Sequence, residues 1–177
     1  MSPLSVDPAG SLTRRRLCKA ALSASLLPLA GLSACARREA APDFGYTLLD
    51  GTRGQSQALR GKVLLVNFWA TTCAVCVKEM PQIVATHQRY RARGFDTLAV
   101  AMSHDPPALV AHFAESRRLP FGVAIDNTGA IARAWGDVRA TPTTFVVDKR
   151  GAIARRWVGE PDFAALHGLI EQLLAEA

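Results

Sequence analysis

Residues 63–81 read VLLVNFWATTCAVCVKEMP, and this stretch decides the fold. Its first part, residues 63–69, is an apolar run typical of a central strand that is buried on both faces. Two cysteines, Cys73 and Cys76, follow, and we expect a helix to begin at Cys73. Apolar and aromatic side chains then recur at steps of three and four residues, and Gly94 is a natural stop for this helix.

The rest of the chain alternates between patterns of strands and helices. Short apolar runs predict the strands, and apolar residues at helical spacing predict the helices. This order predicts an α/β fold in which a mostly parallel sheet has an antiparallel edge and helices on both faces. We expect strands at 97–102, 121–125, 143–148 and 152–158, the last two joined by a tight turn at 149–151. We expect helices at 107–117, 131–135 and 162–176, with Asp162 as a candidate N-cap of the last helix.

The composition fits one globular domain with an accessory segment. The chain has 177 residues, of which 49% are hydrophobic and 20% are charged. Its formal net charge is +6, but four of the basic residues lie between Arg14 and Lys19. The part from Cys35 onward has 17 basic and 14 acidic residues, a weak and scattered excess. We therefore expect no nucleic-acid partner.

Residues 1–34 have the pattern of a signal peptide. An uncharged apolar run at residues 20–34 follows the basic cluster and is too short to span a bilayer comfortably. Residues 13–19 (TRRRLCK) resemble a twin-arginine export signature, and residues 32–35 (LSAC) resemble a bacterial lipobox. Together these motifs predict an exported lipoprotein.

The lipobox also predicts how the mature chain is organised. We expect cleavage before Cys35 and acylation of this residue, which would anchor the protein firmly to a membrane outside the cytoplasm, in the periplasm. Residues 35–42 would then be a lipid-anchored tether, and residues 43–177 would form the folded domain.

The cysteine count indicates a redox pair. Cys18 is lost with the leader and Cys35 is taken by lipid, so Cys73 and Cys76 remain as thiols. They are so close in sequence that a disulfide between them would add little to the stability of the fold. A zinc site would need four ligands, but the chain has neither a second cysteine pair nor histidines at ligand spacing. We expect a redox dithiol with no metal and no cofactor.

A CxxC pair at the start of a helix is suited to disulfide exchange. The helix N-terminus has unpaired backbone N–H groups and the positive end of the helix dipole, and both stabilise a thiolate on the first cysteine. Thiols in such positions titrate at roughly 3.5–7.5 instead of about 8.5. We therefore expect Cys73 to be the exposed nucleophile and Cys76 to attack the mixed disulfide and release the product.

Two motifs together resemble one family. Residues 69–81 (WATTCAVCVKEMP) resemble the WATWCxPCxxEMP segment of thioredoxin-fold proteins, in particular the TlpA and ResA branch of exported thiol:disulfide oxidoreductases. Residues 140–148 (ATPTTFVVD) resemble the cis-proline loop and following strand of that branch. The resemblance covers residues 43–177 and implies a thioredoxin-like fold with a central mixed β-sheet flanked by helices. Residues 105–126 resemble the central insertion of the branch.

The resemblance implies roles for particular residues. Pro142 would be the cis-proline that faces the dithiol, and the backbone of Thr141 would pair with an extended substrate segment. Trp69 is assigned to substrate binding in the same way. Plain thioredoxins have a buried acid where this chain has Asn67, and the branch instead has a glutamate at the position of Glu79, which would accept the proton of the resolving cysteine.

The chain departs from the family pattern inside the motif. Thr72 stands where the family has tryptophan before the first cysteine, and Val75 stands where it has proline before the second. Neighbours of the dithiol tune thiolate stability and reduction potential.

The implied activity is that of an exported, membrane-anchored enzyme that reduces protein disulfides. Family analogy gives apocytochrome c, or the cysteines of an oxidase copper site, as substrate, which places the protein in cytochrome c biogenesis or copper-site assembly. The implied electron donor is a membrane thiol carrier of the DsbD or CcdA type. We expect the protein to be a monomer.

Two other functions compete with this one. Peroxiredoxins share the fold, but they have threonine and proline where this chain has Ala70 and Val66, so a thiol peroxidase is disfavoured. Copper chaperones of the Sco type use a wider CxxxC pair and a distant histidine. His104 could approach the dithiol, but no ligand spacing supports a copper-binding role.

Overall fold

The computed structural model describes residues 38–176, which include a five-stranded mixed sheet in the order β5-β4-β3-β6-β7. The first three of these strands run parallel, and β6 and β7 are antiparallel to their neighbours, as the sequence predicts. The expected signal peptide, the lipobox and Cys35 lie outside the described residues. The strands are β3 (Val63–Trp69), β4 (Phe95–Ala101), β5 (Gly122–Ile125), β6 (Thr143–Val147) and β7 (Ile153–Val158).

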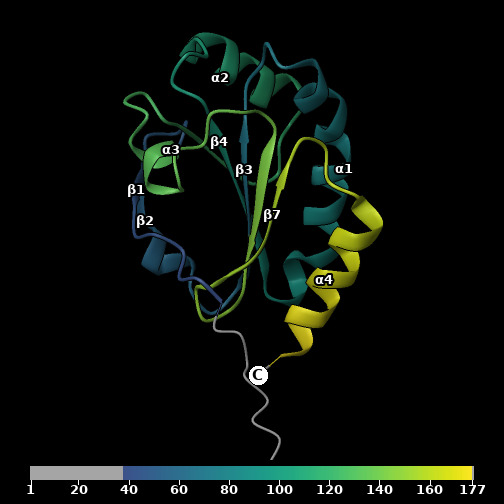
Figure 1. Ribbon diagram of the computed structural model, residues 1–177. Helices are drawn as coiled ribbons and strands as arrows, with labels where there is room; N and C mark the ends of the chain where they lie inside the picture. Colours follow the sequence, from purple (N-terminus) through teal and green to yellow (C-terminus); the bar gives the residue numbers. More distant parts are fainter. Residues whose placement is uncertain (1–37, 177) are drawn as a thin grey trace, which may run out of the picture. The chain divides into compact units, whose positions relative to one another are not determined.

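Strand β3 lies in the middle of the sheet (Figure 1). All seven of its residues are buried. Val63 and Leu65 face one hydrophobic cluster, whereas Leu64, Val66 and Phe68 face the other. The side chains of β3 are apolar on both faces of the sheet because other parts of the chain cover each face.

Three helices cover one face of the sheet. Helices α1 (Ala74–Tyr90), α2 (Pro107–Ser116) and α4 (Phe163–Ala175) contribute to the same cluster as Val63 and Leu65. The 3-10 turn η2 (Arg91–Arg93) continues α1 and ends at Gly94, whose φ of 90° suits a residue without a side chain. The side chain of Asp162 caps α4, as predicted.

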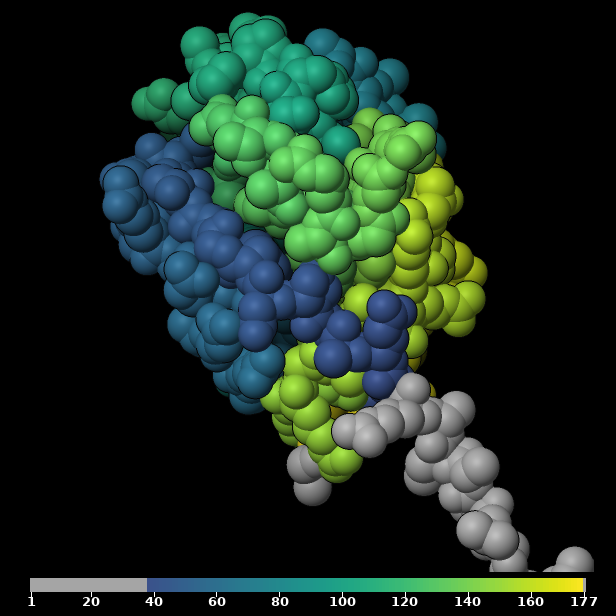
Figure 2. Space-filling view, turned by 60° about the vertical axis from the view of Figure 1, so that its left-hand side comes forward, coloured from purple at the N-terminus to yellow at the C-terminus, as the bar shows by residue number. Residues whose placement is uncertain are grey.

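The opposite face is covered by α3 (Ala130–Ala134) and by N-terminal residues. A short hairpin of β1 (Gly45–Thr47) and β2 (Arg53–Gln55), followed by the 3-10 turn η1 (Ser56–Leu59), was not predicted from the sequence. Figure 2 shows this blue segment lying beside the green segment that contains α3. The strands have three residues each, too few for a hydrophobic repeat to reveal them.

The predicted insertion is present between β4 and α3. It contains α2 and β5, and β5 adds a parallel edge strand beside β4. Of the residues that the structure describes, none belongs to a helix that is both long and apolar enough to cross a membrane.

The described part of the expected tether lies on the folded domain. The guanidinium of Arg38 donates two hydrogen bonds to the Glu176 carboxylate, at 2.9 and 3.0 Å, and one to Asp148 at 2.9 Å. The carbonyl of Glu39 accepts a hydrogen bond from the N–H of Ile153 at 2.7 Å. Residue 40 pairs with residue 152 as an isolated bridge. Residues 38–40, which belong to the expected tether, therefore already contact the domain in the part of the chain that the structure describes.

A chain that begins at residue 41 should be less stable than one that begins at residue 37. The loss should be about 1–2 kcal/mol, because the shorter chain lacks the Arg38 ion pairs and the hydrogen bond to Glu39. Urea unfolding followed by circular dichroism measures the difference. Arg38→Gln in the longer chain should show part of the loss, and equal unfolding free energies for the two chains would contradict this account.

Candidate active site

The two cysteines lie at the junction between the end of β3 and the start of α1. A turn closed by a hydrogen bond from the Cys73 N–H to the Ala70 carbonyl, at 3.1 Å, connects the two elements. Cys73 is the N-cap of α1, and its sulfur accepts the N–H of Cys76 at 3.2 Å. The two residues form a disulfide with their Cα atoms 5.2 Å apart. The structure is therefore that of the oxidised protein.

The surroundings of the two sulfurs differ. Cys73 is half-buried, whereas Cys76 has no exposed surface. The first cysteine also lies at the positive end of the 17-residue helix α1, where a thiolate is favoured over a thiol. The greater accessibility of Cys73 fits its expected role as the nucleophile, which stays a prediction.

A buried carboxyl group lies one helical turn beyond Cys76. Glu79 has no exposed surface, and its Oε1 accepts a hydrogen bond from Asn67 Nδ2 at 3.1 Å. The same amide nitrogen donates to Thr144 Oγ1 at 3.0 Å, so the Asn67 side chain is held from two sides. Glu79 Oε2 has no hydrogen-bond partner among the described residues. One oxygen of the carboxyl group is therefore held in place, and the other is open to a proton.

Burial raises the pKa of Glu79 from 4.5 to about 7. The hydrogen bond from Asn67 acts in the opposite direction, since it stabilises the charged form, and the negative charge of Glu160 raises the pKa further. Glu160 itself forms an ion pair with Lys78 at 3.1 Å on the surface. A carboxyl group that titrates near neutral pH is able both to accept and to return a proton.

The second motif lies at the same end of the sheet. Strand β6 begins at Thr143, which pairs with Phe68 near the end of β3, so the preceding loop lies close to the dithiol. The peptide bond between Thr141 and Pro142 is cis, as predicted. The Pro142 carbonyl accepts the N–H of Gly159 at 2.8 Å, and Thr141 is half-buried. The assignment of Thr141 and Pro142 to substrate binding stays a prediction.

The position of Trp69 differs from the expectation. Its side chain has no exposed surface, and its ring lies 5.0 Å from the ring of Phe113, between centroids. Helix α2 of the insertion therefore covers this tryptophan, which makes it a core residue. Direct substrate contact by Trp69 does not fit this structure.

Sequence reasoning did not identify Thr144 or Asp105 as site residues. Thr144 pairs with Asn67 across β3 and β6, and both are polar residues within otherwise apolar strands. Two polar residues in neighbouring apolar strands could have predicted that their side chains pair inside the core. Asp105 is buried and accepts two hydrogen bonds from Thr71, but no local pattern links residues 34 positions apart.

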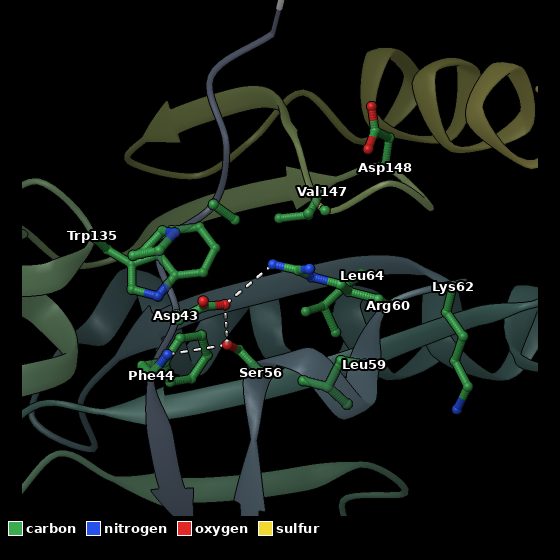
Figure 3. A pocket seen from close by; sticks show the side chains of 13 residues that line it. Asp43, Phe44, Ser56, Leu59, Arg60, Lys62, Leu64, Trp135, Val147 and Asp148 are labelled. Atoms are coloured by element: carbon green, nitrogen blue, oxygen red, sulfur yellow. Dashed lines mark hydrogen bonds and ion pairs between the residues drawn. The ribbon is translucent and has the colours of Figure 1, made fainter.

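Two pockets lie next to the N-terminal residues of the described chain, and no cysteine lines either of them. A cavity of about 30 Å³ lies under the N-terminal segment, where Asp43 accepts hydrogen bonds from Arg60 and Ser56 at 3.3 and 3.4 Å (Figure 3). An open groove of about 610 Å³ lies between the β1–β2 hairpin, α2 and α3. The dithiol lies outside both pockets.

The histidines do not gather at the dithiol. His104 is exposed, and the pKa of His87 is lowered by burial beside Thr97, whose hydroxyl lies 3.2 Å from its ring nitrogen. Within residues 38–176 there is no group of three histidine, cysteine or acidic side chains that could hold a metal ion.

Comparison with curated proteins finds relatives that match about half of the chain. The chain is 35% identical over 96 residues to the thiol-disulfide oxidoreductase ResA of Bacillus thuringiensis subsp. konkukian, and 36% identical over 96 residues to ResA of Geobacillus thermodenitrificans. Each match covers 54% of this chain and 55% of the relative. The chain thus spans about half the length of the curated relatives it matches.

Comparison with solved structures gives the same fold over more of the chain. A protein from Neisseria meningitidis, provisionally identified as a thioredoxin, has a TM-score of 0.74 at 36% identity, with 80% of this chain and 93% of that chain covered. A thiol:disulfide interchange protein of the thioredoxin family from Chlorobium tepidum has a TM-score of 0.73 at 28% identity, with 80% and 100% covered. These similarities confirm the thioredoxin-like fold.

A family model described as Redoxin matches residues 36–169, a range that contains the dithiol, the buried glutamate and the cis-proline loop. The similarity to ResA confirms the resemblance seen in the CxxC segment. With most of the chain matched, this protein belongs to the Redoxin family.

Proposed function

We propose that the protein is a thiol:disulfide oxidoreductase that reduces protein disulfides. The observation that carries this proposal is the CxxC pair at the start of α1, with a half-buried Cys73 and a buried Glu79 one turn beyond Cys76. The relatives named thiol-disulfide oxidoreductase ResA support it.

The exchange proceeds in two steps. The Cys73 thiolate attacks a substrate disulfide, so that the substrate S–S bond breaks, a mixed disulfide forms and one substrate thiolate leaves and takes up a proton. Cys76 then gives its proton to the Glu79 carboxylate and attacks the sulfur of Cys73. The second substrate thiol leaves, the Cys73–Cys76 disulfide forms, and two electrons have passed from the protein to the substrate.

The substrate is engaged at the surface beside Cys73. An extended substrate segment pairs with the backbone of Thr141 next to Pro142, in the manner of an added strand. The loop before β6, which contains Thr141 and Pro142, lies at the end of the sheet where the dithiol lies, and this supports the proposed pairing.

The enzyme acts outside the cytoplasm, anchored by lipid at Cys35. The signal-peptide pattern of residues 1–34 and the LSAC motif support this part of the proposal. Because each cycle leaves the protein oxidised, a dithiol donor must return two electrons, and a membrane thiol carrier of the DsbD or CcdA type fits that need.

Alkylation should separate the two thiols. In the reduced protein at neutral pH, iodoacetamide should label Cys73 at least about tenfold faster than Cys76, because Cys73 is accessible and lies at the helix start. Both cysteines lie in the tryptic peptide of residues 63–78, so tandem mass spectrometry of its fragments measures the two rates. Faster labelling of Cys76 would reverse the assignment, and reduction of insulin by a Cys73→Ser variant at the wild-type rate would overturn the proposed function.

The raised pKa of Glu79 predicts how stability depends on pH. The folded oxidised protein holds the Glu79 proton up to about pH 7, whereas an ordinary glutamate in the unfolded chain releases it at 4.5. The stabilisation is complete below the lower value and is lost as the pH rises through the higher one. From about pH 4 to about pH 8, the unfolding free energy of the wild type should therefore fall by ~3 kcal/mol relative to Glu79→Gln.

Urea unfolding across this pH range measures the difference, and Glu115→Gln is a matched control because Glu115 is an exposed glutamate of α2 that is not among the charges acting on Glu79. Glu79→Gln should also slow insulin reduction about tenfold or more, because the proton acceptor is lost. Parallel stability curves for the wild type and Glu79→Gln, together with unchanged turnover, would show that Glu79 is only a core residue.

Cys35→Ser should move the protein from the membrane fraction to the soluble fraction. The lipid chains would be lost, whereas the dithiol and its surroundings would be unchanged, so the rate of insulin reduction per molecule should stay at the wild-type value. Fractionation of cells and labelling with radioactive fatty acid measure the two forms. A Cys35→Ser protein that stays in the membrane fraction would contradict the anchor.

A further inference from the structure

Two neighbouring turns follow the ends of β3 and β4. The turn at residues 70–73 leads to the nucleophile, and the turn at residues 102–105 leads into the insertion and is closed by a hydrogen bond from the Asp105 N–H to the Met102 carbonyl, at 3.0 Å. The N–H of Met102 donates to the Trp69 carbonyl at 3.0 Å, so the two turns start side by side.

A buried carboxylate joins these turns. Asp105 is 2% exposed, and both of its oxygens face Thr71. Its Oδ2 accepts the backbone N–H of Thr71 at 2.6 Å, and its Oδ1 accepts the Thr71 hydroxyl at 2.5 Å. Hydrogen bonds to a carboxylate are stronger than those between neutral groups, and burial strengthens them further.

The contact acts on the part of the turn that places Cys73. Thr71 is two residues before the nucleophile, within the turn that the Cys73 N–H closes on Ala70. The sulfur of Cys73 is held in turn by the N–H of Cys76 at the helix start. If the turn were free to move, the thiolate would spend less time near the backbone N–H groups that stabilise it.

We propose that Asp105 is a positioning residue for the Cys73 nucleophile, and that it acts through Thr71 by fixing the turn between β3 and α1. The proposal deepens the proposed function and rests on it. It gives the insertion, which begins at Asp105, a direct link to the reactivity of the dithiol.

A second buried carboxylate of the insertion provides a matched comparison. Asp126 is also 2% exposed and also accepts two hydrogen bonds, from the N–H groups of Ile131 and Ala132 at 3.1 and 2.8 Å. These bonds hold the start of α3, whereas those of Asp105 hold the turn before Cys73. Removal of either carboxylate should destabilise the protein, but only the removal of Asp105 should change the chemistry of Cys73.

The decisive variants are Thr71→Val and Thr71→Ser in the full chain. Valine removes the hydroxyl that bonds to Asp105 but keeps its shape, and serine keeps the hydroxyl. Neither substitution changes a charge, so the electrostatic effect of the neighbouring charged residues on the dithiol stays the same. These residues are Asp105, Lys78, Glu79 and Glu160. In Thr71→Val, alkylation of reduced Cys73 at neutral pH should slow about threefold or more and its pH midpoint should rise. Thr71→Ser should behave as wild type.

Asp105→Ala and Asp126→Ala complete the experiment. Both should lower the urea midpoint, but only Asp105→Ala should change the rate and pH profile of Cys73 alkylation. Wild-type alkylation in both Thr71→Val and Asp105→Ala, or equal changes in Asp126→Ala, would overturn the proposal. Because alkylation needs no disulfide substrate, this result is independent of insulin reduction, whose absence in the wild type would instead refute the proposed function.

Discussion

The burial of β3 on both faces is the constraint on which the rest of the structure depends. A strand with no exposed residue needs a covering layer on each side, and the helices and the N-terminal segment supply these layers. The end of this strand is therefore a fixed point in the molecule. The turn that follows delivers Cys73 to the start of α1, and the buried packing of Trp69 beneath α2 holds the end of the strand in place.

The same strand brings a polar group into the core. Asn67 faces α1 from the middle of β3, and it is matched by Glu79 on the helix and Thr144 on β6. Buried polar groups without partners are costly, and this group is only partly satisfied, since Glu79 Oε2 and Asn67 Oδ1 have no partner among the described residues. The cost falls when the carboxyl group is protonated, which explains its raised pKa and suits it to proton transfer during exchange.

The sequence was most informative where periodicity is strong and local. The central strand, the helix after Cys73, the hairpin at Gly151 and the cap at Asp162 could all be predicted. The β1–β2 hairpin was missed because its strands are too short to show a pattern, and Trp69 was misplaced because α2, distant in sequence, covers it. Pairings of distant polar residues depend on the register of the sheet and on the paths of its loops, which a single sequence does not specify.

The most direct test of the account is to trap the mixed disulfide. Reduced Cys76→Ser protein is mixed with a peptide that contains one disulfide, and the products are analysed by mass spectrometry. Because the resolving thiol is absent, the account predicts a lasting adduct in which one sulfur of the peptide is bonded to Cys73, whereas the wild type should release the reduced peptide and form its own disulfide. No adduct at Cys73, or an equal yield of adduct from Cys73→Ser through Cys76, would contradict the account.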